Sequence, residues 1–219
     1  MIQLADVSKV FVCGGIRKVV ADRINLILPT QGAVALIGRN GAGKSSLLKL
    51  ISGTMQPSSG QIIVNGSVSW PVGFAGCFHG ELSGRQNTRF VARIYGIDTD
   101  ALESFVSDFS DLNAHFHLPF RTYSSGMKAR LAFAVSMAID FDTYLIDEVT
   151  SVGDAAFRES SEELLAERLK YRAAVVVSHN LPLLQRICRS AVVLENGRAR
   201  WFDSVDDAIN IHRQRMRTS

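Results

Sequence analysis

The chain has few cysteines and no long apolar run. Its three cysteines, Cys13, Cys77 and Cys188, are scattered without a paired spacing. This pattern argues against a disulfide framework or a cysteine metal site and indicates a reducing compartment. The best apolar stretch, residues 131–139, is far shorter than a membrane span, and the N-terminus has no charged-then-apolar signal segment. We therefore expect that any work at a membrane is done as a peripheral subunit.

Excess charge is also small. The net charge of +3 over 219 residues is too little to indicate nucleic acid as a partner. Hydrophobic residues make up 47% of the chain, which fits either a well-filled α/β core or a surface reserved for partners. The basic tail, residues 212–219, likewise fits either a solvated end or a contact with lipid or another protein.

Short apolar segments alternate with helical periodicity along most of the chain. Residues 1–12 and 23–29 have strand patterns, and the apolar run 33–38 ends in glycine before a helical pattern over 44–53. The pattern turns helical from about 81 to 139, after which strands and helices alternate. Alternating near-continuous apolar strands and helices predict an α/β fold with a mostly parallel core sheet.

We therefore expect one domain over residues 1–219. Residues 1–80 and 140–219 would form its core, and about 81–139 an inserted helical subdomain.

The stretch "GRNGAGKS" matches the phosphate-binding P-loop pattern without a gap. It follows an apolar strand and opens a helix, as that motif requires. Backbone N–H groups would surround the phosphates of ATP, Lys44 would reach the β- and γ-phosphates, and the Ser45 hydroxyl would ligate Mg²⁺. The predicted cofactors are thus ATP and Mg²⁺. The predicted phosphate-binding residues are Gly38, Arg39, Asn40, Gly41, Ala42, Gly43, Lys44, Ser45 and Ser46.

Two other apolar runs end in residues suited to the same chemistry. "TYLIDE" brings Asp147 to a strand end, where it could hold Mg²⁺ through water, and Glu148 could polarise the attacking water. "AAVVVSHN" ends in His179, which we interpret as a γ-phosphate sensor at the same sheet edge. The predicted catalytic residues are therefore Glu148, His179 and Lys44.

Ser124, Ser125 and Gly126 precede a basic helical run, a pattern that offers backbone N–H groups to an anion. With the three motifs above in order, the chain resembles the nucleotide-binding subunit of ABC transporters. The stretch "YSSGM" stands where that family has its signature segment, which binds the γ-phosphate held by a second copy in a head-to-tail dimer. The resemblance places Asp154 at the dimer seam, and Phe11 where an aromatic ring stacks on adenine. Phe11 also fits a buried core position.

The chain departs from the general ABC pattern at three positions. Ser125 replaces the first signature glycine and Met127 the glutamine. Phe74 stands where the family usually places the glutamine that links Mg²⁺ to the membrane subunit. Either water or another group would take the place of that side chain.

The stretches over residues 68–96, 122–154 and 175–180 resemble the ATP-binding subunits of capsular polysaccharide exporters in Gram-negative bacteria. The resemblance implies a peripheral homodimer at the cytoplasmic face of the inner membrane, bound to a multispanning permease. That permease would pass the polymer to periplasmic and outer-membrane export proteins. Residues 72–87 would form the permease-docking groove, although a buried turn fits them too. An O-antigen or teichoic-acid exporter subunit, or a soluble non-transport ABC ATPase, are the alternatives.

Overall fold

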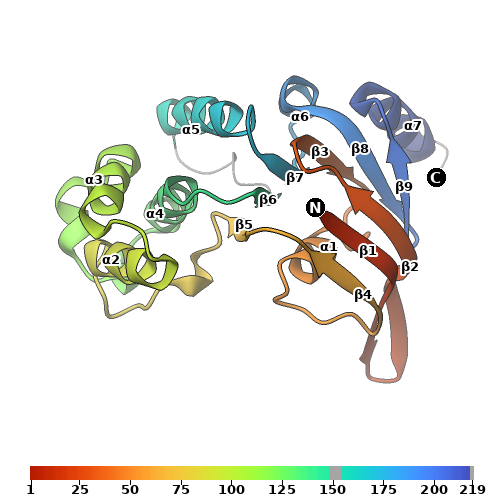
Figure 1. Cartoon of the computed structure of the whole chain (residues 1–219), viewed down its shortest axis with the longest axis horizontal. Helices are drawn as coiled ribbons and strands as arrows, with labels where there is room; N and C mark the ends of the chain where they lie inside the picture. The colour runs from red at the N-terminus through yellow and green to blue at the C-terminus, as the bar shows by residue number, and fades with distance from the viewer. Residues whose placement is uncertain (148–153, 218–219) are drawn as a thin grey trace. The chain divides into compact units, whose positions relative to one another are not determined.

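The chain begins with a long β-hairpin. In the computed structural model, which describes residues 1–147 and 154–217, β1 (Ile2–Cys13) pairs antiparallel with β2 (Ile16–Leu28), and β4 (Ser59–Val64) joins the other edge of β1 (Figure 1). Gly14 and Gly15 turn the chain with φ values of 56° and 80°. A two-residue hairpin turn favours such positive φ values, which glycine adopts readily. The turn sets the register, so Phe11 lies opposite Lys18.

The second sheet has six strands and is mainly parallel. β3 lies between β7 and β8 and is parallel to both, β6 is parallel to β7, and β9 is antiparallel to β8. Every residue of β7 is buried, as expected for a parallel strand covered on both faces. The predicted α/β fold with an antiparallel N-terminal part is therefore confirmed. In sheet order the strands are β5 (Val68–Val72), β6 (Thr143–Asp147), β7 (Ala173–Val177), β3 (Gly32–Ile37), β8 (Cys188–Glu195) and β9 (Arg198–Phe202).

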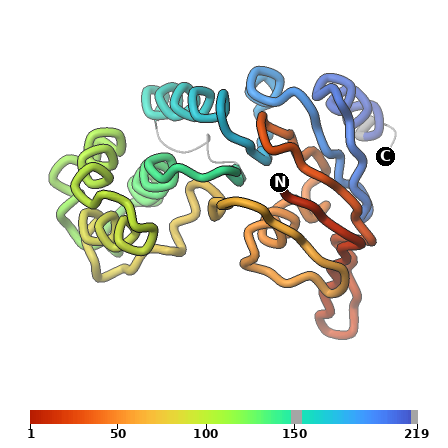
Figure 2. Tube along the Cα trace, viewed as in Figure 1, coloured from red at the N-terminus to blue at the C-terminus, as the bar shows by residue number. Residues whose placement is uncertain are grey.

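Helix α1 (Lys44–Ile51) joins the two sheets in one hydrophobic core. Its leucines Leu47, Leu48 and Leu50 are buried among residues of β1, β2, β3 and β8. Helices α6 (Leu181–Ile187) and α7 (Val205–Arg217) pack on each other, and α7 also packs on β3, β8 and β9 (Figure 2). These elements form one compact unit, which among the described residues covers 1–71, 141–147 and 166–217.

The second compact unit is helical and covers the described residues 72–140 and 154–165. Phe109 stacks on Phe105 and Phe133 at centroid distances of 5.8 and 5.7 Å and meets Phe157 edge-on at 5.6 Å. Because Phe157 packs in this core, the unit extends past the range 81–139 expected from sequence. Its elements are η1 (Ala75–Cys77), α2 (Gly84–Tyr95), α3 (Thr99–Ser110), η2 (Asn113–His117), η3 (Phe120–Thr122), α4 (Ser125–Ala138) and most of α5 (Ala155–Arg168).

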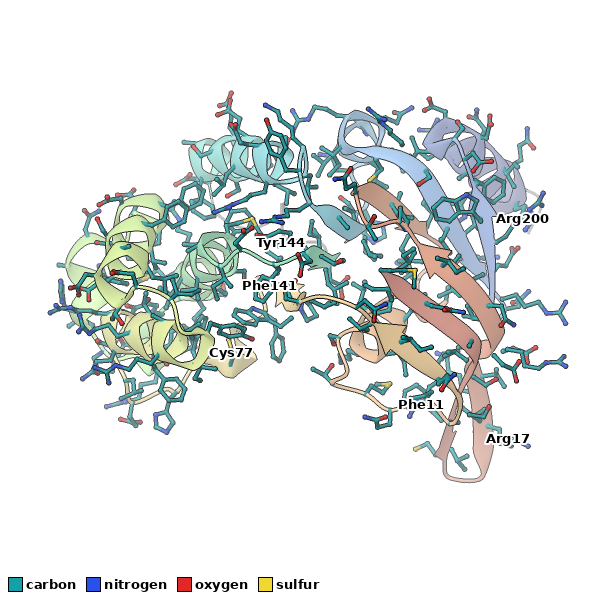
Figure 3. The ribbon with its side chains drawn as sticks, in the orientation of Figure 1. Phe11, Arg17, Cys77, Phe141, Tyr144 and Arg200 are labelled. Carbon is teal, nitrogen blue, oxygen red and sulfur yellow. The ribbon has the colours of Figure 1, made fainter. Side chains whose placement is uncertain are left out.

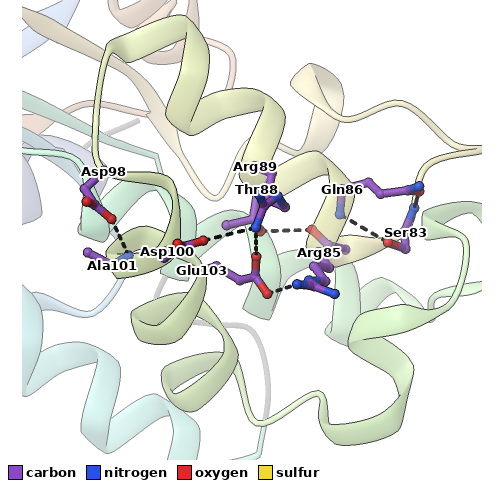
Figure 4. A network of polar contacts seen from close by, with 10 residues as sticks. Ser83, Arg85, Gln86, Thr88, Arg89, Asp98, Asp100, Ala101 and Glu103 are labelled. Atoms are coloured by element: carbon purple, nitrogen blue, oxygen red, sulfur yellow. Dashed lines mark hydrogen bonds and ion pairs between the residues drawn. The ribbon is translucent and has the colours of Figure 1, made fainter.

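An ionic network joins α2 to α3 (Figure 4). The Glu103 carboxylate accepts hydrogen bonds from Arg85 at 2.5 Å and from Arg89 at 2.8 Å, and Arg89 also donates to Asp100 at 3.2 Å. Burial acts to raise the pKa of Glu103, but the bonds from Arg89 and Arg85 outweigh it and hold the pKa below its usual range. The pair of helices is thus fixed by charge as well as by apolar contact.

The loop that leads into α2 is held by the buried amide of Asn87. Its oxygen accepts from the His79 backbone N–H at 2.8 Å, and its nitrogen donates to the carbonyls of His79, Leu82 and Ser83. Asn87 is only 1% exposed, so these backbone groups have no water to replace the amide. A single side chain therefore fixes the shape of residues 79–83.

We expect Asn87→Ala to lower the free energy of unfolding by about 2–4 kcal/mol, because it leaves several buried polar groups unpaired. Gln86→Ala, at the exposed neighbouring position of the Ser83–Gln86 capping box, is the matched control and should cost about 1 kcal/mol. Urea unfolding of the two variants measures both values. Equal losses would contradict the role of Asn87.

Candidate nucleotide-binding site

The P-loop connects the end of β3 to the start of α1. Gly41 and Gly43 have φ values of 77° and 104°, and Gly43 caps α1 without a side-chain hydrogen bond. The Ala42 N–H donates to the Arg39 carbonyl at 3.0 Å, which closes the loop on itself. The first N–H groups of α1 are thus not capped by a side chain, as a phosphate-binding helix start requires.

Two glycines of the loop stand where a side chain would collide with backbone. A Cβ on Gly38 would lie 2.5 Å from the carbonyl oxygen of Leu194, and one on Gly43 would lie 3.0 Å from that of Val20. Glycine at these positions lets β3 and α1 pack closely against β8 and β2.

Lys44 lies across the loop that precedes it. Its ammonium group donates to the Gly38 carbonyl at 2.8 Å and to the Arg39 carbonyl at 3.2 Å. The positive charge is therefore held over the same loop whose N–H groups would surround a phosphate. This arrangement fits a polyphosphate ligand.

The predicted polar residues at strand ends meet at one edge of the parallel sheet. Asp147, the last residue of β6, is level with Val177 of β7, and Ser178 and His179 follow directly. The neighbouring strand β3 ends at Ile37, one residue before the P-loop. Since the carboxyl ends of adjacent parallel strands share an edge, Asp147, His179 and the P-loop are brought together.

The backbone around His179 is fixed on both sides. The Asn180 N–H donates to the Ser178 hydroxyl at 3.0 Å, and the Asn180 side chain caps α6 by accepting from the Leu183 N–H at 3.1 Å. His179 itself is exposed. Its place in the turn between strand and helix is thus determined by its two neighbours.

Phe11 lies beside the P-loop, not in the core. Figure 3 labels Phe11 near the hairpin. The residue is 38% exposed, and the Lys9 ammonium lies 5.3 Å from the centroid of its ring. A cavity of about 410 Å³ joins the hairpin to the loop, and its lining includes Phe11, Lys18, Val20, Asn40, Gly41, Gly43, Lys44, Ser45 and Ser46. An exposed aromatic ring at one end and a phosphate loop at the other suit a nucleotide.

Sequence reasoning missed two groups of side chains in this region. Lys18 lines the cavity with Phe11, and the Gly14–Gly15 turn could have revealed it, because a two-residue turn pairs residue 11 with residue 18. His212 and Arg213 of α7 line a second cavity with Lys44 and His179. No local pattern pointed to that contact.

In the helical unit, the signature segment forms the start of α4. Ser124 is its N-cap, and the hydroxyl accepts from the Met127 N–H at 3.2 Å. Ser124 and Ser125 are exposed, and Gly126 is half-buried. Tyr123 is buried and donates to the His115 carbonyl at 2.6 Å, which anchors the segment. The segment thus presents an exposed helix N-terminus.

Asp154 lies at the start of α5 and is tied to α4. Its carboxylate accepts from the Phe157 N–H at 2.9 Å and pairs with Arg130 at 2.5 Å. The bond from Phe157, followed by the charge of Arg130, lowers the pKa of Asp154 below its ordinary value. Arg130 also lies 4.8 Å from the Phe157 ring centroid. Asp154 is therefore an anchored carboxylate.

Two further sequence predictions concern the permease groove and the general base. Phe74 is 52% exposed, which excludes a core position for its ring. Glu148 lies outside the described residues.

The remaining predicted residues fall into two sets. The P-loop, Phe11, Asp147 and His179 belong to the first unit, and Ser124, Ser125, Gly126 and Asp154 belong to the helical unit.

The side chains near the P-loop fit ATP with Mg²⁺ as its metal. Ser45, at the second position of α1, and Asp147 supply hydroxyl and carboxylate oxygen, the donors that Mg²⁺ prefers. The cavity lined by Asn40, Gly41, Gly43 and Lys44 provides space for a phosphate chain. Among the helices of the described residues, none has the length and apolar character for a membrane crossing.

Comparison with known proteins agrees with an ATP-binding function. Residues 21–151 match the ABC transporter family. The chain is 46% identical over 198 residues to the polysialic acid transport ATP-binding protein KpsT of Escherichia coli, covering 90% of this chain and 88% of that protein. It is 42% identical over 214 residues to the ATP-binding protein BexA of Haemophilus influenzae, covering 98% and 99% of the two chains.

A solved structure shares the fold at low sequence identity. It is a dimeric ATP-binding cassette in a post-hydrolysis state, bound to ADP and phosphate. The TM-score is 0.80 at 19% identity, over 93% of this chain and 98% of that one.

We expect Gly38→Ala to lower the free energy of unfolding by about 1–3 kcal/mol, because the added methyl group must displace the backbone of β8. Gly126→Ala is the matched control: its Cβ would meet only the Ser124 hydroxyl, at 3.9 Å, so stability should change little. Thermal unfolding of the two variants measures the difference. A Gly38→Ala protein as stable as wild type would show that the close approach of β3 and β8 is not constraining.

Proposed function

The chain belongs to the ABC transporter family and is an ATP-hydrolysing transport subunit, and from this premise we propose that it drives export of a capsular polysaccharide across the inner membrane. The observation that carries the proposal is its similarity to KpsT, a polysialic acid transport protein, over nearly the whole of both chains. The capsule polysaccharide export protein CtrD of Neisseria meningitidis agrees with it, at 42% identity over 95% of this chain and 96% of that protein.

The proposed site assigns each part of ATP to residues of the first unit. Adenine would stack on the exposed Phe11 ring, and the N–H groups of residues 38–46 would bind the phosphates together with Lys44. Ser45 and Asp147 would hold Mg²⁺, which neutralises phosphate charge when bound. Glu148 would act as the general base toward water, and His179 would contact the γ-phosphate.

The second half of each catalytic site would come from another copy of the chain. Ser124, Ser125 and Gly126 form an exposed helix start in the helical unit, which suits an anion but finds no P-loop within that unit. We infer that they bind the γ-phosphate on a second copy in an ATP-dependent, head-to-tail homodimer, with Asp154 at the seam. In this proposal the two units form one nucleotide-binding domain over residues 1–219.

The helical unit has an exposed apolar surface suited to a membrane partner. Phe74, Phe90, Ile94 and Tyr95 are each between 45% and 61% exposed, and Phe90 and Ile94 share one face of α2. Such a surface is typical of a protein contact. We propose that a multispanning permease docks here, holding the subunit at the cytoplasmic face of the inner membrane. Periplasmic and outer-membrane export proteins would act downstream.

The assigned chemistry predicts different defects for two catalytic substitutions. Lys44→Ala should weaken ATP binding more than tenfold, because the charge on the β- and γ-phosphates is lost. Glu148→Gln should bind ATP normally and slow hydrolysis by about 100-fold or more, since an amide does not take a proton from water. Nucleotide titration and phosphate release measure the two effects.

In cells, the Glu148→Gln subunit should leave capsular polysaccharide inside, whereas wild type delivers it to the surface. Surface polymer at wild-type levels with the Glu148→Gln subunit would refute the export role. Tight ATP binding by Lys44→Ala would refute the P-loop assignment instead.

A mixing experiment tests the composite site. Ser124→Arg should leave ATP binding to the single subunit intact but prevent ATP-driven pairing, because the side chain fills the space for the partner's γ-phosphate. Mixed with Lys44→Ala, it can form a heterodimer with one intact composite site, so pairing of differently labelled subunits should partly return.

The control is Ser83→Arg, which removes the N-cap serine of α2 and costs about 1 kcal/mol of stability without touching the signature segment. It should pair as wild type does. Normal hydrolysis by Ser124→Arg alone would contradict a site shared between two copies.

A further inference from the structure

The last helix of the chain directs one face toward the phosphate loop. Val205, Ala208 and Ile209 of α7 are buried, and α7 packs on β3, β8 and α6. His212 follows Ile209 by three residues and Ala208 by four, so it continues the same face. His212 is half-buried, and it is where this apolar stripe gives way to polar groups.

His212 and the adjacent Arg213 line a cavity of about 440 Å³ with the nucleotide site. The cavity also touches Gly38, Lys44, Ser178 and His179. Basic side chains thus come from three parts of the chain: the P-loop, the turn after β7, and α7. Among the described residues that line the cavity there is no carboxylate.

The charges around His212 are mainly positive. Burial lowers the pKa of His212, the charges of Lys44 and Arg39 lower it further, and only Glu195 acts in the opposite direction. Glu195 is itself paired with Arg215, one turn further along α7. A half-enclosed site with the cations of Lys44 and Arg213 and no lining acid attracts an anion, because the anion relieves the repulsion between them.

We propose that α7 forms a third wall of the phosphate site, and that His212 and Arg213 contact the terminal phosphoryl group of ATP or the phosphate ion released from it. The inference rests on the proposed assignment of ATP to the P-loop. The ligand chemistry is that of a phosphoryl anion, since Lys44 and His179 of the same cavity lie where the γ-phosphate is expected. A nucleotide that ends at the β-phosphate does not reach α7.

The test compares ATP with ADP in the full-length subunit. The double variant His212→Gln/Arg213→Gln should bind the non-hydrolysable analogue adenylyl imidodiphosphate about tenfold more weakly, the loss expected for charge-assisted hydrogen bonds. Its affinity for ADP should stay within about twofold of wild type. His212→Lys, which places a hydrogen-bond donor at the same position, should retain most of the preference for the triphosphate.

Arg215→Gln is the matched control, since it removes a charge from the same helix but does not line this cavity. It should leave both affinities unchanged. Titration of inorganic phosphate onto the ADP-bound protein distinguishes the γ-phosphate of bound ATP from the released phosphate ion. Weaker phosphate binding by the double variant would show that α7 contacts the released ion as well. Unchanged phosphate binding would show that α7 contacts only the γ-phosphate of bound ATP.

Unchanged affinity of the double variant for the analogue would overturn the inference. Equal losses of affinity for the analogue and for ADP would overturn it too, because they would report only disturbed packing of α7. Lys44→Ala distinguishes this failure from failure of the proposed function. If Lys44→Ala loses the analogue while the double variant keeps it, the P-loop assignment stands and the role of α7 is wrong.

Discussion

The close approach of β3 to β8 at Gly38 is the constraint on which the nucleotide site depends. A side chain there would collide with the Leu194 carbonyl, so only glycine lets β3 leave the sheet at this point. The chain then closes through Gly41 and Gly43 and enters α1, whose leucines hold both sheets in one core. The phosphate loop is therefore attached to the hydrophobic core of the first unit, which restricts its shape.

Charge in the site is arranged around that loop. Lys44 folds onto the carbonyls of its own loop, and Asp147 and His179 stand at the ends of neighbouring strands. Positive charge from α7 adds to this edge through Arg213, which lines the same cavity as Lys44. The balance favours a ligand with several negative charges, and the Asp147 carboxylate is the kind of oxygen donor that the proposed Mg²⁺ would prefer.

In the helical unit, buried hydrogen-bonding side chains fix the loops that precede α2 and the signature segment. Buried polar anchors, Asn87 before α2 and Tyr123 before α4, fix loops that would otherwise have many conformations. Arg130 connects the signature helix to Asp154 at the start of α5. The exposed helix start at Ser124 is thus anchored, which would lower the entropy lost in the proposed binding of an anion presented by a second copy.

The sequence by itself determined the elements whose information is local. Uninterrupted apolar runs predicted the parallel strands, the P-loop spacing predicted the turn from strand to helix at residues 38–44, and the Gly14–Gly15 turn carries enough information to pair Phe11 with Lys18. Only the tertiary structure decided that His212 of α7 lies beside Lys44, and that Phe74 is exposed. Local periodicity reports which face of a helix is buried, but the partner of that face is chosen by packing between segments far apart in the chain.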